Sequence, residues 1–372
     1  MIPLNDLKRS YRLSAETRLA ISRVLDSGNW VHGPEHELFE RELAGYLGVN
    51  HVLGVASGTD ALEIALLALG CDSKSRVITV ANAGGYVSIA ASRIGCEVLY
   101  CDVDPITLQM DPAHLKTIIS EEIDVVVVTH LYGNVAPIFE IKNLCNEYGI
   151  KVIEDCAQAL GASTNNLKVG SICDIGTFSF YPTKNLGGLG DGGALACESD
   201  IYADKIRSLR QYGWGEKYFV EVSGGMNSRL DEIQAAILRI GLPLLDEMNE
   251  KRRNILVRYS QSMRSTQIKL VTSFSPGNVG HLAVCILPSA GARENFRTHM
   301  RNYGIQTQVH YPILDSQQRG FELGGMQTDT PISVQSVHQI VTIPLFPELE
   351  SDEVEIITNA LQAFESETVA NV

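Results

Sequence analysis

The chain of 372 residues has no block rich in lysine and arginine, and its acidic residues outnumber its basic ones, for a formal net charge of −14. This composition argues against nucleic acid as a partner, because binding to a phosphate backbone depends on clustered positive charge. Binding of a small anionic ligand remains possible, since backbone amides and a few local cations are enough to bind one.

Long apolar runs are absent as well. The best candidate, residues 61–69, is broken by Glu63 and is much shorter than the roughly 20 residues that cross a bilayer. Residues 1–8 lack the cationic and then apolar pattern of a signal peptide. We therefore expect a cytoplasmic protein that does not bind membranes.

The eight cysteines are scattered, mostly within apolar segments, and no two of them form a Cys-x-x-Cys pair. Disulfide frameworks and zinc sites both need cysteines in regular groups. The pattern therefore predicts reduced, buried thiols, and no metal site is expected. The sequence also has no internal repeat and no low-complexity segment.

What the sequence does contain is an alternation of short apolar runs and helical patterns between residues 52 and 154. Residues 125–128 are apolar at every position, as expected for a strand that is covered on both faces. Such alternation predicts βαβ units around a mostly parallel sheet, which is an α/β fold. Because the alternation ends later in the chain, and the length exceeds that of one ordinary core, we expect a large domain over residues 1–245 and a smaller α+β domain over residues 246–372.

One lysine, Lys184, stands out because of its surroundings. It lies on a predicted loop between two apolar runs, residues 176–180 and 193–197, with glycines on its C-terminal side. A lysine partly shielded from water loses some preference for its charged form and can become a nucleophile toward carbonyl carbons. A loop lysine in an ordinary hairpin is the alternative. The glycines of residues 188–193 match a dinucleotide-binding fingerprint in spacing, but the chain continues as a strand, whereas that fingerprint opens a helix.

Two further segments place polar groups at the carboxyl ends of predicted strands, where open α/β sheets bind ligands. Ser57, Gly58 and Thr59 lie between a strand and a helix. The start of that helix can bind a phosphate, or it can simply be capped by one of the hydroxyls. Asp155 ends another strand, with Gln158 three residues further on, and is placed either to meet a ligand or to cap a helix.

His310 follows a predicted strand over residues 305–309, where a lone histidine is most often structural, and Asn227 precedes a helix that it could cap. A loop lysine, a strand-end aspartate and a phosphate-type helix start together fit pyridoxal 5'-phosphate (PLP). That cofactor needs an amine for a Schiff base, a carboxylate that keeps its pyridine nitrogen protonated, and donors for its phosphate.

Six motifs carry a family resemblance. They are residues 57–62, 130–133, 154–158, 178–185 with 190–193, 226–232 and 310–312. With these motifs in this order, the chain resembles, from about residue 2 to residue 365, the DegT/DnrJ/EryC1/StrS family of PLP-dependent sugar aminotransferases. The resemblance implies a PLP-dependent transferase of fold type I, similar to aspartate aminotransferase, with a large mostly parallel-sheet domain and a smaller C-terminal domain.

The resemblance also implies roles for single residues. Lys184 resembles the lysine that forms the Schiff base and shuttles a proton between the substrate carbon and the cofactor. Asp155 resembles the partner of the pyridine nitrogen, and Gln158 resembles the contact to the ring hydroxyl. The phosphate ligands of the family match Gly58, Thr59, Ser179 and, from the neighbouring subunit, Asn227. An obligate homodimer with shared active sites is therefore implied.

Many members of the family carry an aromatic residue that stacks on the cofactor. Ungapped alignment puts Gly84 at that position, and Tyr86, two positions later, is the candidate for the contact. Residues 82–86 and 180–184 are most similar to the branch that aminates carbon 3 of dTDP-3-keto-6-deoxyhexoses. In that branch the residues near the sugar would match Tyr181, Tyr218 and His310.

The implied reaction has two halves. L-glutamate leaves its nitrogen on the cofactor as pyridoxamine 5'-phosphate (PMP) and departs as 2-oxoglutarate, and a keto-sugar carried on a nucleotide then accepts the amine, as in deoxyamino-sugar biosynthesis. Lys184 argues against the family's dehydratase branch, in which a histidine replaces the lysine. Three alternatives stay open: a 4-keto sugar nucleotide as acceptor, an inosose-type cyclitol as acceptor, and a non-catalytic PLP-binding regulatory protein.

Overall fold

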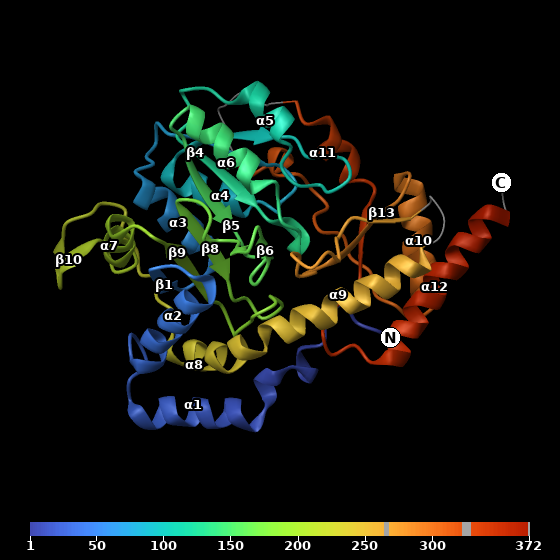
Figure 1. Ribbon diagram of the computed structural model, residues 1–372, viewed down its shortest axis with the longest axis horizontal. Helices are drawn as coiled ribbons and strands as arrows, with labels where there is room; N and C mark the ends of the chain where they lie inside the picture. The colour runs from blue at the N-terminus through green and yellow to red at the C-terminus, as the bar shows by residue number, and fades with distance from the viewer. Residues whose placement is uncertain (264–267, 322–328, 371–372) are drawn as a thin grey trace.

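The computed structural model describes residues 1–263, 268–321 and 329–370, with side chains as far as residue 364. Seven strands form its central sheet: β1 (His51–Val55), β2 (Arg76–Val80), β3 (Glu97–Cys101), β4 (Val125–Thr129), β5 (Lys151–Asp155), β8 (Ile175–Ser179) and β9 (Gly193–Cys197). Their order in the sheet is β1-β9-β8-β5-β4-β2-β3 (Figure 1). β9 runs antiparallel to both of its neighbours and the other pairs are parallel, so the predicted α/β fold with a mostly parallel sheet is confirmed.

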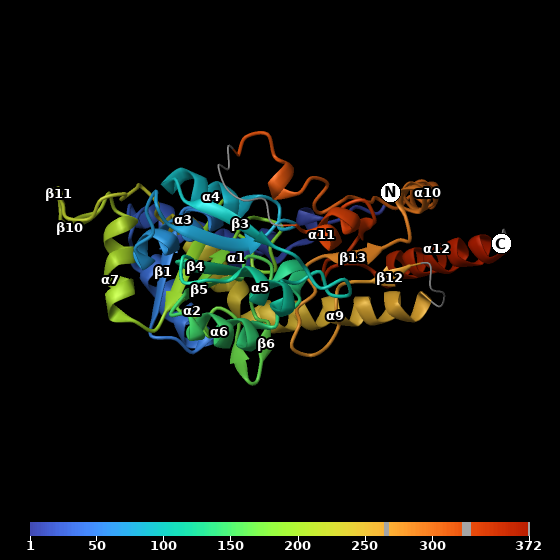
Figure 2. The same cartoon turned by 90° about the horizontal axis from the view of Figure 1, so that it is seen from above.

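The central strands are apolar at every position because both faces of the sheet are covered. Val125 and Val127 of β4 belong to one buried cluster, whereas Val126 and Val128 belong to another on the opposite face. Helices lie on both sides of the sheet (Figure 2). The first cluster includes residues of α3 (Gly58–Leu69), α4 (Tyr86–Ile94) and α7 (Asp200–Leu209), and the second includes residues of α5 (Pro112–Ile118) and α6 (Ile138–Glu147).

A third cluster covers β1, β9 and β8 on the face opposite the first cluster, and α2 (Pro34–Leu47) and α8 (Glu232–Gly241) pack there. α2 begins with Pro34 in its first turn and is followed by Gly48 in the left-handed conformation, the residue types that favour a helix start and a helix end. α1 (Ala15–Ser27) packs on α8 through Ala20 and Val24.

The C-terminal part of the chain has its own small sheet and its own core. α9 (Leu245–Ser262) leads to it from the central body (Figure 1). Its elements are β12 (Lys269–Leu270), β13 (Ala283–Ile286), β14 (Ile340–Ile343), α10 (Ala290–Asn302), α11 (Pro331–Ser336) and α12 (Ser351–Ala370). Phe296, Tyr259 and Ile357 are buried together there, and the N-terminal Ile2 joins them. A domain boundary between residues 245 and 246 stays a prediction.

The strand expected over residues 305–309 does not form. Ile305 and Gln308 take part only in isolated bridges, with Ile2 and Thr342 respectively. The pairing stops there because the chain next turns toward the large sheet, where the Tyr132 hydroxyl donates to the backbone oxygen of His310 at 2.8 Å. Two short hairpins were not anticipated: β6 (Ser163–Thr164) with β7 (Leu167–Lys168), and β10 (Trp214–Glu216) with β11 (Phe219–Val220).

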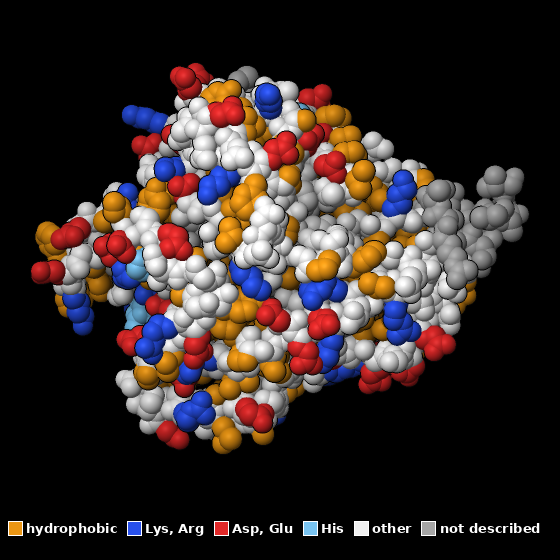
Figure 3. All heavy atoms as spheres, viewed as in Figure 1, with side chains coloured by type: hydrophobic (Ala, Val, Ile, Leu, Met, Phe, Trp, Pro, Cys, Tyr) orange, Lys and Arg blue, Asp and Glu red, His pale blue; other side chains and the backbone are white. Residues whose placement is uncertain are grey.

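Basic and acidic side chains are mixed on the surface of the protein. On the face shown in Figure 3, lysine and arginine side chains are interspersed with acidic ones and are not gathered into one basic patch. Among the described helices, none is both long enough and apolar enough to cross a membrane.

Candidate active site

Three of the segments singled out in the sequence meet at one edge of the central sheet. Asp155 is the last residue of β5, and Ser179 is the last residue of β8, its parallel neighbour. Gly58 begins α3 just beyond β1 and lies so close to Ser179 that a Cβ at position 58 would be 2.7 Å from the Cβ of Ser179. Because strands of the same direction end at the same edge, the helix start and the aspartate come together there.

Asp155 is buried and has few partners. Its carboxylate accepts hydrogen bonds from the Thr129 hydroxyl at 3.2 Å and from the Ala157 amide at 3.1 Å. Burial raises the pKa of this carboxyl, and the Ala157 amide and the positive charge of Lys184 partly oppose the rise. A buried carboxylate of this kind is stabilised when a cation lies opposite it. A protonated ring nitrogen is one such cation.

Lys184 lies on the loop that follows β8, where its backbone amide donates to the Tyr181 backbone oxygen at 2.8 Å. Burial of the side chain lowers the pKa of its amine to about 8, although the Asp155 carboxylate acts in the opposite direction. The neutral, nucleophilic form is therefore far more populated at neutral pH than in a surface lysine, whose pKa is about 10.4.

The lowered pKa predicts how fast Lys184 captures an aldehyde. Only the neutral amine attacks a carbonyl carbon, so the rate at which the cofactor-free protein combines with added PLP should rise with pH, with a midpoint near pH 8. Stopped-flow absorbance at a series of pH values measures this rate. A midpoint near the ordinary lysine pKa of about 10.4 would contradict the environment described for Lys184.

The start of α3 offers backbone amides to an anion. The Ser57 hydroxyl caps the helix by accepting from the Asp60 amide at 3.1 Å, while the amides of Gly58 and Thr59 have no acceptor among the described residues. The positive end of the helix dipole favours negative charge at this place. A side chain at position 58 would push against Ser179, which explains the glycine there.

Gln158 and His310 border the same region. The Gln158 side chain accepts from the Tyr132 amide at 2.7 Å and donates to the Tyr311 hydroxyl at 3.1 Å. His310 is hydrogen-bonded to the Thr342 hydroxyl at 2.9 Å. Burial, together with the charge of Lys184, lowers the pKa of His310 to about 4, so this imidazole is neutral at neutral pH.

Other expected site residues lie at the surface of the described chain. Tyr218 is 76% exposed at the turn of the β10–β11 hairpin, which extends away from the central sheet (Figure 1). Tyr181 and Tyr86 are 51% and 44% exposed, and Asn227 is exposed as well. The fold of one chain therefore brings Lys184 and Asp155 together with the helix start, but it does not bring Tyr218 to them.

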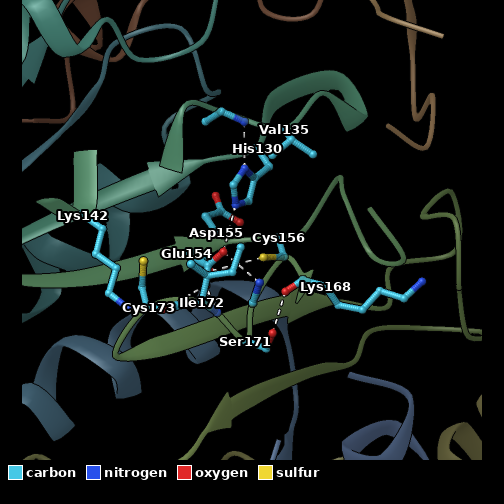
Figure 4. A network of polar contacts seen from close by, with 12 residues as sticks. His130, Val135, Lys142, Glu154, Asp155, Cys156, Lys168, Ser171, Ile172 and Cys173 are labelled. Atoms are coloured by element: carbon cyan, nitrogen blue, oxygen red, sulfur yellow. Dashed lines mark hydrogen bonds and ion pairs between the residues drawn. The ribbon is translucent and has the colours of Figure 1, made fainter. Parts of the chain in front are cut away.

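Sequence analysis missed the structural role of Glu154, which is fully buried in β5 (Figure 4). Its carboxylate accepts from the backbone amides of Gly170, Ile172 and Cys173 at 2.8 to 2.9 Å. It also contacts His130 Nε2 at 3.2 Å, and since His130 Nδ1 accepts from a backbone amide, Nε2 carries the proton. An acidic residue inside an otherwise apolar strand was the available signal, because buried charges need partners.

Truncating Glu154 is expected to destabilise the fold. Glu154→Ala leaves three backbone amides and one imidazole without an acceptor, which should lower the free energy of unfolding by about 3–5 kcal/mol. Urea unfolding measures this change. Glu147→Ala, at an exposed position of α6, is the matched control and should stay within about 0.5 kcal/mol of the unchanged protein. Equal effects of the two substitutions would refute the role given to Glu154.

His130, Glu154 and Cys156 lie close enough together to hold a metal ion. Their donor atoms already take part in hydrogen bonds with one another and with the backbone. Burial also raises the pKa of the Cys156 thiol well above its usual range, and a protonated thiol is a poor metal ligand. We therefore read this cluster as part of the core behind β5.

His281 was also missed. It is buried, and its Nδ1 atom is hydrogen-bonded to the side-chain oxygen of Asn185 at 2.8 Å. Asn185 in turn donates to the Asn249 side chain at 2.7 Å. These bonds hold the residue that follows Lys184 against α9, so they help to fix the direction of the lysine loop.

The donor set of this edge fits PLP. A shielded amine suits the aldehyde, a buried carboxylate suits the protonated ring nitrogen, and the start of α3 beside Ser179 offers donors for a phosphate. The fold and the site together define a PLP-dependent transferase of fold type I.

Comparison with known proteins gives the family. The model of the DegT/DnrJ/EryC1/StrS aminotransferase family matches residues 12–362, and the chain belongs to this family. It is 37% identical over 366 residues to the dTDP-3-amino-3,6-dideoxy-alpha-D-galactopyranose transaminase of Aneurinibacillus thermoaerophilus, covering 98% of this chain and 99% of that protein. The protein is thus an aminotransferase, as the motifs predicted.

Two solved structures support the same conclusion. S. venezuelae DesV, in complex with a ketimine intermediate, superposes with a TM-score of 0.92 at 34% identity, covering 98% of each chain. NtdA of Bacillus subtilis, with bound cofactor PMP, superposes with a TM-score of 0.90 at 28% identity over 98% of this chain and 85% of that one. The predicted fold type and the predicted cofactor, PLP alternating with PMP, are confirmed at the level of the family.

Proposed function

We propose that this aminotransferase moves the amino group of L-glutamate to a nucleotide-linked keto-sugar, in particular to carbon 3 of a dTDP-3-keto-6-deoxyhexose. The relative from Aneurinibacillus, whose printed name is that of a dTDP-3-amino-sugar transaminase, supports this choice of acceptor. The single structural observation behind the proposal is the placement of Lys184, on the loop after β8, close enough to the buried carboxylate of Asp155 for the two charges to interact.

In this proposal each residue has a defined task. The cofactor, when bound, supplies an electron sink for the bond that breaks at the substrate's amine-bearing carbon. Lys184 Nζ would take the proton from that carbon and pass it to the cofactor. Its pKa of about 8 allows this proton transfer near neutral pH. Asp155 would hold the proton on the ring nitrogen, and Gln158 would contact the hydroxyl group of the cofactor ring. Gly58, Thr59 and Ser179 would hold its phosphate.

The acceptor would approach from the exposed side of the lysine loop. We place Tyr181 and His310 on that side, because Tyr181 is exposed on the loop itself and His310 is close enough to Lys184 to interact with its charge. Burial and that charge lower the pKa of His310, so its imidazole is neutral. A neutral imidazole can accept or donate a hydrogen bond to a sugar hydroxyl without adding charge. We assign Tyr181 and His310 to the sugar on this basis.

The function is tested with the purified holoprotein. Addition of L-glutamate should bleach the yellow absorbance of bound PLP and release 2-oxoglutarate, and a dTDP-3-keto-6-deoxyhexose should then restore the absorbance. An unchanged spectrum with glutamate would favour the non-catalytic regulatory protein. Restoration by a 4-keto sugar nucleotide or an inosose alone would overturn the assignment to carbon 3 and leave the aminotransferase intact.

We further propose a homodimer in which Asn227 reaches the phosphate of the partner's cofactor. Asn227 is exposed in the single chain, whereas the next residue, Ser228, is buried and donates to the Asp60 carboxylate of α3 at 2.7 Å. This bond anchors the segment and leaves the Asn227 side chain free to reach another subunit. Light scattering on the purified protein should give twice the mass of one chain, and a monomer that retains activity would refute the shared site.

A further inference from the structure

The loop after β2 packs against an aromatic ring from the C-terminal part of the chain. A Cβ built on Gly84 would lie 2.9 Å from three atoms of the Tyr311 ring, Cε1, Cε2 and Cζ. Because these three ring atoms are equally far from it, the added Cβ would lie over the middle of the ring, so the α-carbon of Gly84 faces the flat side of the Tyr311 ring. Glycine is therefore required at position 84 both by this contact and by its positive φ of +87°.

Tyr311 is held in this place from both sides. On one side, the backbone oxygen of His310 accepts from the Tyr132 hydroxyl at 2.8 Å. On the other side, the Asp315 amide donates to the Ala81 backbone oxygen at 2.8 Å, and the Asp315 carboxylate accepts from the Ser88 hydroxyl at 3.0 Å. The segment 310–315 is thus fastened to the loop after β2 and to α4.

The Tyr311 ring also lies at the edge of the proposed cofactor site. Its hydroxyl accepts from the Gln158 side chain at 3.1 Å, and Gln158 is three residues beyond Asp155. Burial raises the pKa of the Tyr311 phenol, and the negative charge of Asp155 adds to the rise, so the two side chains are close enough to interact. A flat aromatic ligand whose polar edge is bound by Asp155 and Gln158 still needs an apolar surface for one face.

We propose that Tyr311 supplies that aromatic surface and packs against the pyridine ring of the cofactor, in the place that a side chain at position 84 cannot fill. The inference rests on PLP binding as set out under the proposed function. It differs from the expectation for Tyr86, which opens α4 with 44% of its surface exposed. The Tyr86 ring meets the Tyr311 ring edge to face, with the centroids 6.2 Å apart, and so braces Tyr311 from the solvent side.

The test measures PLP binding to the cofactor-free protein, by quenching of intrinsic fluorescence and by circular dichroism of the bound cofactor. Tyr311→Leu should raise the Kd about three- to ten-fold and reduce the visible dichroic band. Tyr311→Phe keeps the ring and should stay within about two-fold. Tyr148→Leu, at an exposed tyrosine that follows α6, is the matched control and should change neither readout.

Tyr86→Leu tests the competing assignment. A larger rise in Kd for Tyr86→Leu than for Tyr311→Leu would overturn the proposal, and so would tighter binding of PLP by Tyr311→Leu, which would mean that the ring occupies the place of the cofactor. If the unchanged protein binds no PLP, the proposed function fails as well. If it binds PLP and bleaches with glutamate, the proposed function holds, and the Kd values of the Tyr311 and Tyr86 variants alone decide the role of Tyr311.

A second variant keeps the test decisive should Tyr311→Leu fail to fold. Gly84→Ala adds a methyl group that presses on the face of the Tyr311 ring, so it should weaken PLP binding by at least about three-fold. Gly70→Ala carries a similar strain, at a φ of +96°, but its Cβ would meet nothing within 4 Å. Equal Kd values for the two glycine variants would refute the proposal.

Discussion

Replacing Lys184 by methionine is expected to lower the rate of amino transfer from glutamate by at least about 10³-fold. In the proposed function the same amine is both the nucleophile toward the cofactor and the base that moves the substrate proton, so both tasks would be lost together. Methionine is also unbranched and of similar length, and it has no charge to bury beside Asp155. Single-turnover absorbance after mixing the holoprotein with L-glutamate measures the rate.

The control for this substitution is Lys151→Met, at the exposed start of β5, where the lysine forms a surface ion pair with Asp174 at 3.2 Å. That variant should keep its full rate. Added methylamine should restore part of the lost rate of Lys184→Met, because a small free amine can enter the space and take the proton. Retention of more than a tenth of the rate without added amine would show that another group carries out the proton transfer.

Replacing Asp155 by asparagine is expected to slow amino transfer by about 10²–10⁴-fold while the cofactor still binds. Asparagine has the same shape, and its side-chain oxygen can still accept from the Ala157 amide, as Asp155 does at 3.1 Å. It cannot keep a ring nitrogen protonated, because it carries no negative charge. The electron sink is weakened although the geometry is preserved, and the same single-turnover experiment measures the loss.

Two comparisons separate charge from shape at this position. A PLP analogue methylated at the ring nitrogen carries its positive charge permanently, so it should restore a large part of the rate of Asp155→Asn. Asp174→Asn, which removes an acidic residue from the surface pair with Lys151, should leave the rate unchanged. Full activity of Asp155→Asn with ordinary PLP would refute the role assigned to the carboxylate.

Much of the site could be predicted because it depends on local chemistry. The segment Ser57-Gly58-Thr59 alone predicts an anion site at the start of α3, since the first backbone amides of any helix lack partners within the helix. Asp155 follows an apolar strand, and the ends of parallel strands share an edge. The role proposed for Lys184 also rests on its position between two apolar runs, which the structure shows to be β8 and β9.

Other features depend on segments far apart in the chain. The contact between Gly84 and the Tyr311 ring joins residues more than 200 positions apart in the chain. The hydrophobic periodicity of neither segment indicates this contact. The same holds for Glu154, whose partners are the backbone amides of a later loop and not neighbouring side chains. The strand expected over residues 305–309 was wrong for a related reason, because its edge contact ends where the chain turns toward the large sheet.

The amino-acid sequence alone indicates the α/β class, because apolar periodicity is a property of short segments, and its ordered motifs indicate the family. The amine and the carboxylate that we propose for the site come from the same short segments. The tertiary structure alone decided the order of the strands, the antiparallel direction of β9 and the ring that lies against Gly84. These arise when distant segments compete to cover the same apolar surface, and the outcome of that competition depends on the whole folded chain.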